Sequence, residues 1–277
     1  AHPAQLVRDA ACAAGAPEYL VQCITAPSME ASAALMNHEG IATIFSTGGN
    51  AMVKAAYSCG KPALGVGAGN VPAYVEKSAN IRQAAHDIVM SKSFDNGMVC
   101  ASEQAVIIDK EVYDEFVEEF KSYHTYFVNK KEKALLEEFC FGAKANSKNC
   151  AGAKLNPDIV GKPATWIAEQ AGFSVPEDTN ILAAECKEVG EKEPLTREKL
   201  SPVIAVLKSE SREDGVEKAR QMVEFHGLGH SAAIHTADEE LTKEFGKAVR
   251  AIRVICNSPS TFGGIGDVYN AFLPSLT

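Results

Sequence analysis

Three features that would point to other classes of protein are missing from this chain of 277 residues. No C-x-x-C pair occurs among its eight cysteines, which excludes the usual ligand spacing of a zinc site or a redox dithiol, so we expect no metal. No apolar stretch is long and charge-free enough to cross a bilayer, so we expect no membrane partner. No basic run interleaved with aromatic residues is present, and the net charge of −9 argues against nucleic-acid binding.

The cysteines and the first residues indicate where the protein works. A large acidic chain with dispersed cysteines fits a reducing compartment, so we expect a cytoplasmic location. The start, Ala1-His2-Pro3, has neither the charged nor the apolar segment of a signal peptide. It also lacks an initiator methionine, and we expect residues to precede it. The cysteines are Cys12, Cys23, Cys59, Cys100, Cys140, Cys150, Cys186 and Cys256.

Alternation of short apolar runs with helical patterns predicts an α/β protein with a parallel sheet and right-handed crossovers. Apolar runs of this length are typical of buried parallel strands. We expect strands at Tyr19–Ile24, Ile41–Ser46, Pro62–Val66, Val71–Glu76, Ala105–Ile108, Val203–Leu207, Ser231–His235 and Arg253–Cys256. We expect helices at Ala4–Ala14, Ser28–Asn37, Ala51–Cys59, Ile81–Ser93, Glu111–Tyr126, Glu132–Phe141, Pro163–Ala171, Gly215–Phe225 and Glu239–Val249, with a polar loop at 144–154.

The pattern changes at Gly65-Val66-Gly67-Ala68-Gly69-Asn70, and we place a domain boundary near Asn70. The first domain is then 1–70 and the second, again α/β, begins at 71. The stretch does not fit the dinucleotide fingerprint G-x-G-x-x-G, and a strand rather than a helix follows it. Two interpretations stay open: another backbone or a ligand approaches these glycines closely, or they form a bend between domains.

Cys100 is the first candidate for chemistry. It lies on a glycine-containing loop between the predicted helix Ile81–Ser93 and the run Ala105–Ile108. A thiol in such a loop can meet substrate and nearby backbone N–H groups, and both favour the nucleophilic thiolate. The alternative is a small buried hydrophobe, which is the usual fate of a free cysteine.

Three further segments are weaker candidates. Thr47-Gly48-Gly49 lies between a strand and a helix, where free N–H groups suit a phosphate or a dinucleotide, although an ordinary turn also favours glycine. Glu198 precedes a strand and could accept ribose hydroxyl groups, or be an ordinary surface carboxylate. His230 precedes a strand and could act as acid or base, or be a satisfied histidine in a turn. His226 has no better claim.

Taken together, these segments resemble the CoA-acylating branch of the aldehyde dehydrogenase superfamily. The closest likeness is to the aldehyde dehydrogenase half of bifunctional aldehyde-alcohol dehydrogenases, and it runs over nearly the whole chain. The motifs that carry it are Ala14-Gly15-Ala16-Pro17, Thr47-Gly48-Gly49, Gly60-Lys61-Pro62-Ala63, Gly65 to Asn70, Ser91 to Gly97 leading to Cys100-Ala101-Ser102-Glu103-Gln104, Lys199-Leu200-Ser201-Pro202, Gly229-His230 and Gly263-Gly264-Ile265-Gly266-Asp267.

The resemblance implies a Rossmann-type cofactor domain, here residues 1–70 and incomplete at its N-terminus, and an α/β catalytic domain at 71–260. Residues 261–277 would return toward the cofactor and oligomerisation region. Cys100 would be the nucleophile, and His230 would assist CoA attack or its positioning. The NAD site would include Glu198 at the nicotinamide ribose, together with Thr47, Gly48, Gly49 and Gly65.

The resemblance also implies a reaction. The Cys100 thiolate would attack a short-chain aldehyde, NAD would take the hydride, and CoA would take the acyl group from the resulting thioester; the reverse direction would reduce acetyl-CoA in fermentation. Hydrolytic members carry a water-activating glutamate where this chain has Gly65, which favours CoA over water. A homo-oligomer is expected from the likeness alone.

Two alternatives remain open at this stage. One is an acylating dehydrogenase for another short aldehyde, such as sulfoacetaldehyde. The other is a non-catalytic structural or filament-forming fragment, since the family's first cofactor strands and an oxyanion asparagine have no counterpart in these residues.

Overall fold

The computed structural model describes residues 2–142, 154–266 and 273, and the chain divides into two units, Ala1–Val66 and Gly67–Thr277. The predicted loop at 144–154 lies outside the described residues except for Lys154, as does most of the predicted return segment beyond Gly266. The division falls after Val66 rather than at Asn70, because the Asn70 side-chain amide donates hydrogen bonds to Thr196 O and Met222 O of the second unit.

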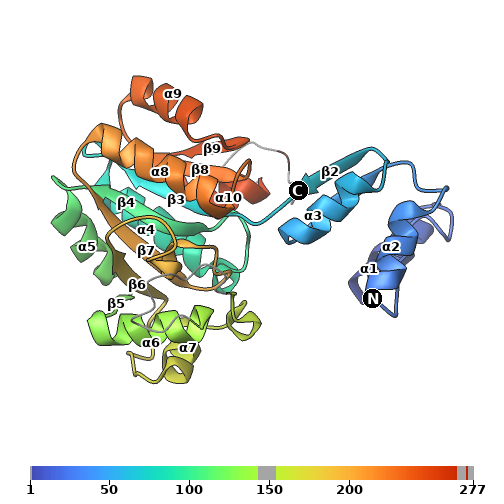
Figure 1. Ribbon diagram of the computed structural model, residues 1–277, viewed down its shortest axis with the longest axis horizontal. Coiled ribbons are helices and arrows are strands. Elements are labelled where there is room, and N and C mark those ends of the chain that lie inside the picture. The colour runs from blue at the N-terminus through green and yellow to red at the C-terminus, as the bar shows by residue number, and fades with distance from the viewer. Residues whose placement is uncertain (1, 143–153, 267–272, 274–277) are drawn as a thin grey trace. The chain divides into compact units, whose positions relative to one another are not determined.

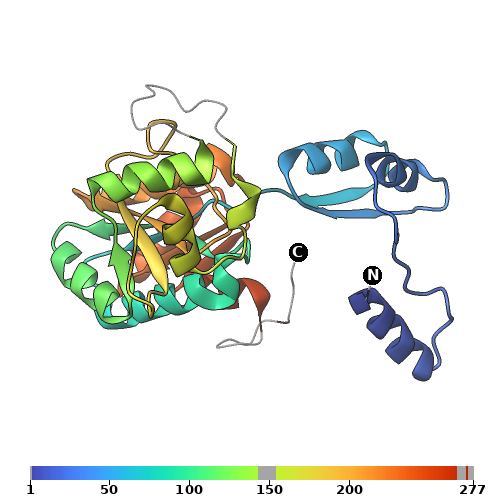
Figure 2. The ribbon, with the colours of Figure 1, turned by 90° about the horizontal axis from the view of Figure 1, so that it is seen from below.

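The first unit contains a parallel pair of strands joined by a helix. β1 (Ile44–Thr47) and β2 (Ala63–Val66) pair in register from Ile44↔Ala63 to Thr47↔Val66. The connecting helix α3 (Asn50–Ser58) packs along both strands, as Figure 2 shows. Before them come α1 (His2–Ala13) and α2 (Met29–Asn37), the latter capped by the Ser28 side chain. This is the expected strand–helix–strand unit.

The strand predicted at Tyr19–Ile24 is wrong. These residues form turns and irregular chain, and the side chains of Tyr19 and Leu20 are 74% and 64% exposed. A buried strand must pair its N–H and C=O groups with a neighbouring strand, and among the described residues β1 pairs only with β2.

The second unit is built on a seven-stranded sheet whose order is β5-β6-β7-β4-β3-β8-β9, with all pairs parallel. This confirms the expected α/β fold with a parallel sheet. Its strands are β3 (Val71–Val75), β4 (Glu103–Asp109), β5 (Thr125–Phe127), β6 (Ile181–Cys186), β7 (Val203–Ser209), β8 (Ser231–His235) and β9 (Arg253–Cys256). Its helices are α4 (Ile81–Ser93), α5 (Tyr113–Ser122), α6 (Lys130–Phe141), α7 (Ala164–Ala171), α8 (Arg212–His226), α9 (Glu239–Ala248) and α10 (Ser260–Ile265), with short 3-10 turns at Phe94–Gly97, Pro157–Ile159 and Pro194–Thr196.

Helices cover both faces of this sheet and enclose two buried cores (Figure 1). One core lies under α6, α7, α8 and α9, and the other lies under α4 and α5. Strand β3 serves both, because Tyr74 points into the first core while Ala73 and Val75 point into the second. Burial on both faces explains why these strands read as continuous apolar runs rather than alternating ones.

Two strands of the sheet, β5 and β6, were not predicted from the sequence. The helix expected at Glu111–Tyr126 ends at Ser122, since His124 has a positive φ of 62° that breaks the helical path. The chain then enters β5, which pairs with β6. The family motif that begins at Gly263 overlaps the short helix α10. No helix in the described part of the chain combines the length and the hydropathy needed to span a membrane.

Candidate active site

Five adjacent strands of the sheet bring the reactive side chains to one edge. Glu198 precedes β7, Cys100 precedes β4, Gly69 precedes β3, His230 directly precedes β8 and Arg253 opens β9. In the sheet these strands are consecutive neighbours in the order β7-β4-β3-β8-β9. Because parallel strands run in one direction, their amino ends meet at the same edge, so residues far apart in sequence become neighbours there.

Gly69 is the point where three of these segments touch. Its N–H donates a 2.6 Å hydrogen bond to Glu198 Oε1. A Cβ added to Gly69 would overlap the Cys100 carbonyl oxygen and lie 3.1 Å from both Cε1 and Nε2 of His230. The structure therefore brings Cys100, Glu198 and His230 together around one residue that has no side chain, which is the close approach foreseen for this glycine-rich stretch.

The neighbouring Asn70 fixes this segment in place. Besides the two hydrogen bonds from its amide, its backbone nitrogen lies where a Cβ on Gly227 would sit. From the sequence, Asn70 was only a domain-boundary marker and the last residue of a family motif. A polar side chain next to a run of glycines was the available signal, because an almost fully buried amide needs partners and its partners lock the strand.

The loop that carries Cys100 is held in an unusual backbone conformation. Asp95 and Asn96 have φ of 50° and 49°, and Gly97 follows at 66°. The Asn96 side chain donates to Gly161 O at 3.0 Å, and the Ser102 hydroxyl donates to Gly97 O at 3.2 Å. Asparagine, aspartate and glycine are the residues that adopt such angles most readily, and so the local sequence supports this turn.

Cys100 is partly buried, and its environment acts on the thiol in two directions. Burial and the charge of Glu198 raise its pKa, while the backbone N–H groups of Cys100 and Ala101 and the charge of Arg253 lower it. The net direction is upward. The expectation that the loop favours the thiolate is thus met by the backbone groups and by Arg253, but burial and Glu198 outweigh them in this conformation.

His230 is buried and its side chain stays neutral at pH 7. Burial, and then the positive charge of Arg253, lower its pKa to about 4. Its Nδ1 lies 3.1 Å from the Ser231 hydroxyl, and its Nε2 faces Gly69. A neutral imidazole has one nitrogen with a free lone pair, which is the form able to accept a proton.

Glu198 is placed by its neighbour Lys199, which the sequence analysis did not single out. The fully buried Lys199 ammonium donates to the carbonyl groups of Leu195 and Arg197 and, across the sheet, of Gln104. Its backbone N–H donates to the Gln104 side chain at 3.0 Å. These bonds tie the Glu198 loop to the amino end of β4 and hence to Cys100; burial lowers the pKa of Lys199 to about 7.

Lys92 and Glu103 are two further buried charged residues beside the Cys100 loop. The Lys92 ammonium donates to the Ser102 hydroxyl at 3.4 Å, and burial lowers the pKa of Lys92 well below its usual value. Glu103 accepts from the Ser260 N–H at 2.9 Å, and burial raises its pKa to about 7. Lys92 thereby connects the loop to α4, and Glu103 connects the start of β4 to α10.

The other predicted cofactor residues lie in the first unit. Thr47 ends β1, Gly48 N–H donates to Val66 O at 3.1 Å, and Gly49 is the N-cap of α3 with no side chain capping it. The space around Gly49 is open, since no atom lies within 4 Å of an added Cβ. Gly65 is different: an added Cβ would lie 2.6 Å from Val53 of α3, so packing alone demands glycine there.

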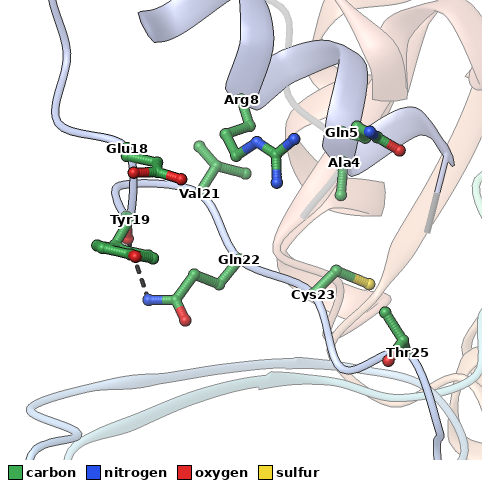
Figure 3. A pocket seen from close by; sticks show the side chains of 9 residues that line it. All are labelled: Ala4, Gln5, Arg8, Glu18, Tyr19, Val21, Gln22, Cys23 and Thr25. Atoms are coloured by element: carbon green, nitrogen blue, oxygen red, sulfur yellow. Dashed lines mark hydrogen bonds between the residues drawn. The ribbon is translucent and has the colours of Figure 1, made fainter.

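The first unit also holds a pocket of about 350 Å³ between α1 and the irregular segment that follows it (Figure 3). Arg8, Glu18 and Cys23 line it, and the Gln22 amide donates to Tyr19 O. None of the predicted site residues lines this pocket. Within the described residues, no group of three or more histidine, cysteine or acidic side chains could hold a metal ion.

Comparison with known proteins agrees with this geometry. The model of the aldehyde dehydrogenase family matches residues 2–267. The chain belongs to the aldehyde dehydrogenase family. This confirms the family resemblance drawn from the motifs.

The similar proteins include an aldehyde-alcohol dehydrogenase and an acetylating aldehyde dehydrogenase. The chain is 91% identical over 277 residues to the aldehyde-alcohol dehydrogenase of Streptococcus pneumoniae serotype 4, and spans 31% of that protein's length. It matches an acetylating aldehyde dehydrogenase from Geobacillus thermoglucosidasius with 43% identity and a TM-score of 0.91, covering all of this chain and 59% of that one. It also matches a propionaldehyde dehydrogenase from Rhodopseudomonas palustris, solved with bound CoA and an acylated cysteine, with 31% identity and a TM-score of 0.83 over 94% of this chain and 56% of that one.

Proposed function

We propose that this chain is part of a CoA-acylating aldehyde dehydrogenase that interconverts acetaldehyde, CoA and NAD with acetyl-CoA and NADH. The observation that carries this proposal is the contact at Gly69, which brings the Cys100 backbone, a neutral imidazole and a carboxylate together at one edge of the sheet. A related enzyme solved with CoA and an acylated cysteine supports it. The first unit would be part of the cofactor domain and the second the catalytic domain.

Cys100 is the nucleophile in this scheme. Its sulfur, as thiolate, adds to the aldehyde carbonyl carbon and the carbonyl π bond opens to an alkoxide. Backbone N–H groups near Cys100, which also act on its thiol, are placed to donate to that oxygen. Loss of hydride from the adduct then leaves an acyl thioester on Cys100. Attack by the CoA sulfur releases the thiolate again, so the cysteine is regenerated.

His230 acts on the CoA thiol. As the imidazole is neutral at pH 7, its unprotonated nitrogen can accept the thiol proton and release the CoA thiolate for attack. Its low pKa makes the imidazole a weak base, so it does not keep the proton after accepting it. Contact with Gly69 and the hydrogen-bonding distance to Ser231 fix the ring's position.

The residues present fit NAD at two places. In the first unit, Thr47 and the uncapped start of α3 at Gly48 and Gly49 offer open space and backbone N–H groups to a polar ligand. In the second, the Glu198 carboxylate can accept hydrogen bonds from the ribose hydroxyls. NAD supplies the hydride acceptor when bound.

Gly65 supports CoA rather than water as the acyl acceptor. The hydrolytic branch has a water-activating glutamate at this position, and here packing of α3 leaves no room even for a Cβ. Without a base at that point, attack by water on the thioester is unassisted. The homo-oligomer and the cytoplasmic location stay predictions from the sequence.

The test is NADH formation from acetaldehyde and NAD, with and without CoA, by the complete natural polypeptide that contains these residues. We expect CoA-dependent NADH that Cys100→Ala abolishes. Cys256→Ala is the matched control, because that thiol is exposed at the opposite end of β9. Equal turnover without CoA would reject the acylating assignment, and full activity of Cys100→Ala would reject the nucleophile.

A further inference from the structure

Arg253 brings a positive charge to the amino edge of the sheet. It opens β9 and pairs in register with Ser231 of β8, the residue that follows His230. Its Nη1 atom lies 3.5 Å from the point where a Cβ on Gly264 would sit, and the Ala101 Cβ lies 2.6 Å from the same point. Arg253 therefore lies next to the sequence neighbours of both Cys100 and His230, and a side chain at Gly264 would collide with Ala101.

Glu198 brings the opposing charge from the other side. Its carboxylate is held by the Gly69 N–H, and Gly69 in turn touches the Cys100 carbonyl group. Cys100 thus lies between a carboxylate from the β7 side and a guanidinium from the β9 side. In the part of the chain that the structure describes, Arg253 takes part in none of the ion pairs found.

Other charged or titratable groups surround the same loop. Those in the buried layer are fixed by hydrogen bonds to backbone or hydroxyl groups rather than directed at the sulfur. The described charged or titratable residues on the elements around the loop are Lys92 of α4, Asp95 of the loop itself, Glu103 of β4, Glu198 and Lys199 before β7, His230 before β8 and Arg253 of β9.

We propose that Arg253, and not a protonated His230, supplies the positive charge that stabilises the Cys100 thiolate. The inference rests on the proposed function, in which Cys100 is the nucleophile. Arg253 is a positioning residue: it acts through the sulfur and does not exchange protons with substrate. The active pair is then a thiolate beside a neutral imidazole, with the guanidinium as counter-ion, instead of the thiolate–imidazolium pair that many cysteine nucleophiles use.

Electrostatics among these groups supports this arrangement. Arg253 lowers the pKa of the Cys100 thiol, whereas Glu198 raises it. The same guanidinium lowers the pKa of His230, because two positive charges would repel at this distance. One cation therefore favours a negative sulfur and a neutral imidazole at the same time.

The test is the pH dependence of Cys100 alkylation by iodoacetamide in the complete polypeptide, without aldehyde, NAD or CoA. Alkylation rates at the Cys100 peptide are measured by mass spectrometry, with the exposed Cys256 as internal reference. We expect Arg253→Met to raise the midpoint of the profile by about one pH unit, since an opposite charge this close commonly moves a pKa by that amount or more. Arg253→Lys should restore at least half of the shift.

Two further variants are expected to change the alkylation midpoint differently from Arg253→Met, and they make the experiment decisive. Glu198→Gln should lower the midpoint, and His230→Gln should leave it unchanged, because a neutral ring contributes no charge. An unchanged midpoint in Arg253→Met, or a rise in His230→Gln as large as that in Arg253→Met, would overturn the proposal. Circular dichroism checks folding, and Arg253→Gln replaces a methionine variant that does not fold.

The alkylation assay is independent of turnover, so failures of the two proposals are distinguishable. Absence of CoA-dependent NADH together with the predicted shifts would reject the enzyme activity and keep the role of Arg253. Normal turnover with no shift in Arg253→Met would keep the activity and reject that role.

Discussion

Replacing Gly69 with alanine is the sharpest test of how the site is assembled. The backbone at Gly69 is outside the left-handed region, so alanine is not disfavoured by conformation. The obstacle is contact: the new methyl group would overlap the Cys100 carbonyl oxygen, and distances below 3.0 Å do not persist for real Cβ atoms. Relief requires the two segments to separate by about 1 Å, and a displacement of that size in a catalytic group commonly costs about 100-fold in rate.

We therefore expect Gly69→Ala to lower kcat/KM for CoA-dependent NADH formation by about 100-fold, which is about 2.7 kcal/mol in activation free energy. Thermal unfolding should change much less, because the strain falls on loops at the sheet edge and not on either core. Gly246→Ala is the matched control: Gly246 lies in α9, with no atom within 4 Å of an added Cβ. That variant should keep full activity and gain about 0.5–1 kcal/mol of stability from helix propensity.

Retention of more than about a tenth of the activity by Gly69→Ala would refute the argument that this contact positions Cys100 and His230. A comparable loss of activity in Gly246→Ala would show that the assay reports general destabilisation. Alkylation of Cys100 in Gly69→Ala separates a misplaced sulfur, which still reacts with iodoacetamide, from an unfolded unit.

Three further predictions address the surroundings of the site. Gly65→Glu should not create CoA-independent turnover, because its Cβ would meet Val53 and must displace α3; NADH formation without CoA is the measurement. Lys199→Met should lower the free energy of unfolding by about 3 kcal/mol or more, since it leaves three buried carbonyl groups without their donor; urea titration measures this, and a loss below 1 kcal/mol would contradict it. His235, whose pKa burial lowers to about 4, binds protons only in the unfolded state between about pH 6.5 and 4. Stability should therefore fall by up to about 3 kcal/mol as pH drops through that window, and His235→Met should remove that part of the slope.

The fold was predictable wherever one residue pattern had one structural solution. The helix Ile81–Ser93 and the strands Ser231–His235 and Arg253–Cys256 were predicted with their observed bounds. Tyr19–Ile24 failed because an apolar run says nothing about whether a partner strand is within reach. β6 was missed although four of its six residues are apolar and buried in succession and Pro176 to Asn180, a turn-forming stretch, directly precede it.

The candidate site was predictable for residues with reactive side chains and not for those that organise them. Cys100, Glu198 and His230 stood out by their chemistry and by motif, and the structure places them around one point. A close approach at the stretch Gly65 to Asn70 was one of the two interpretations, but the sequence did not identify Gly69 as the contact point, because its contribution is the absence of a side chain. Lys199 was missed because lysine in a sequence suggests solvent, and only its burial reveals three carbonyl partners.

The order of the strands in the sheet brings the site residues together, and no single sequence motif contains them all. In open parallel sheets, ligands usually bind at the carboxyl ends of the strands. Here the carboxyl end of the central strand β4 carries Asp109, which accepts from the Tyr74 and Ser209 hydroxyls and from the Lys77 N–H. These hydrogen bonds occupy both carboxylate oxygens of Asp109 and connect β4 to β3 and β7.

The amino edge has the opposite character. The groups gathered there approach one another through backbone contacts at Gly69 and leave the His230 Nε2 without a partner of its own among the described hydrogen bonds. The order β7-β4-β3-β8-β9 is what makes five separate loops, spread from Gly69 to Arg253, into one site.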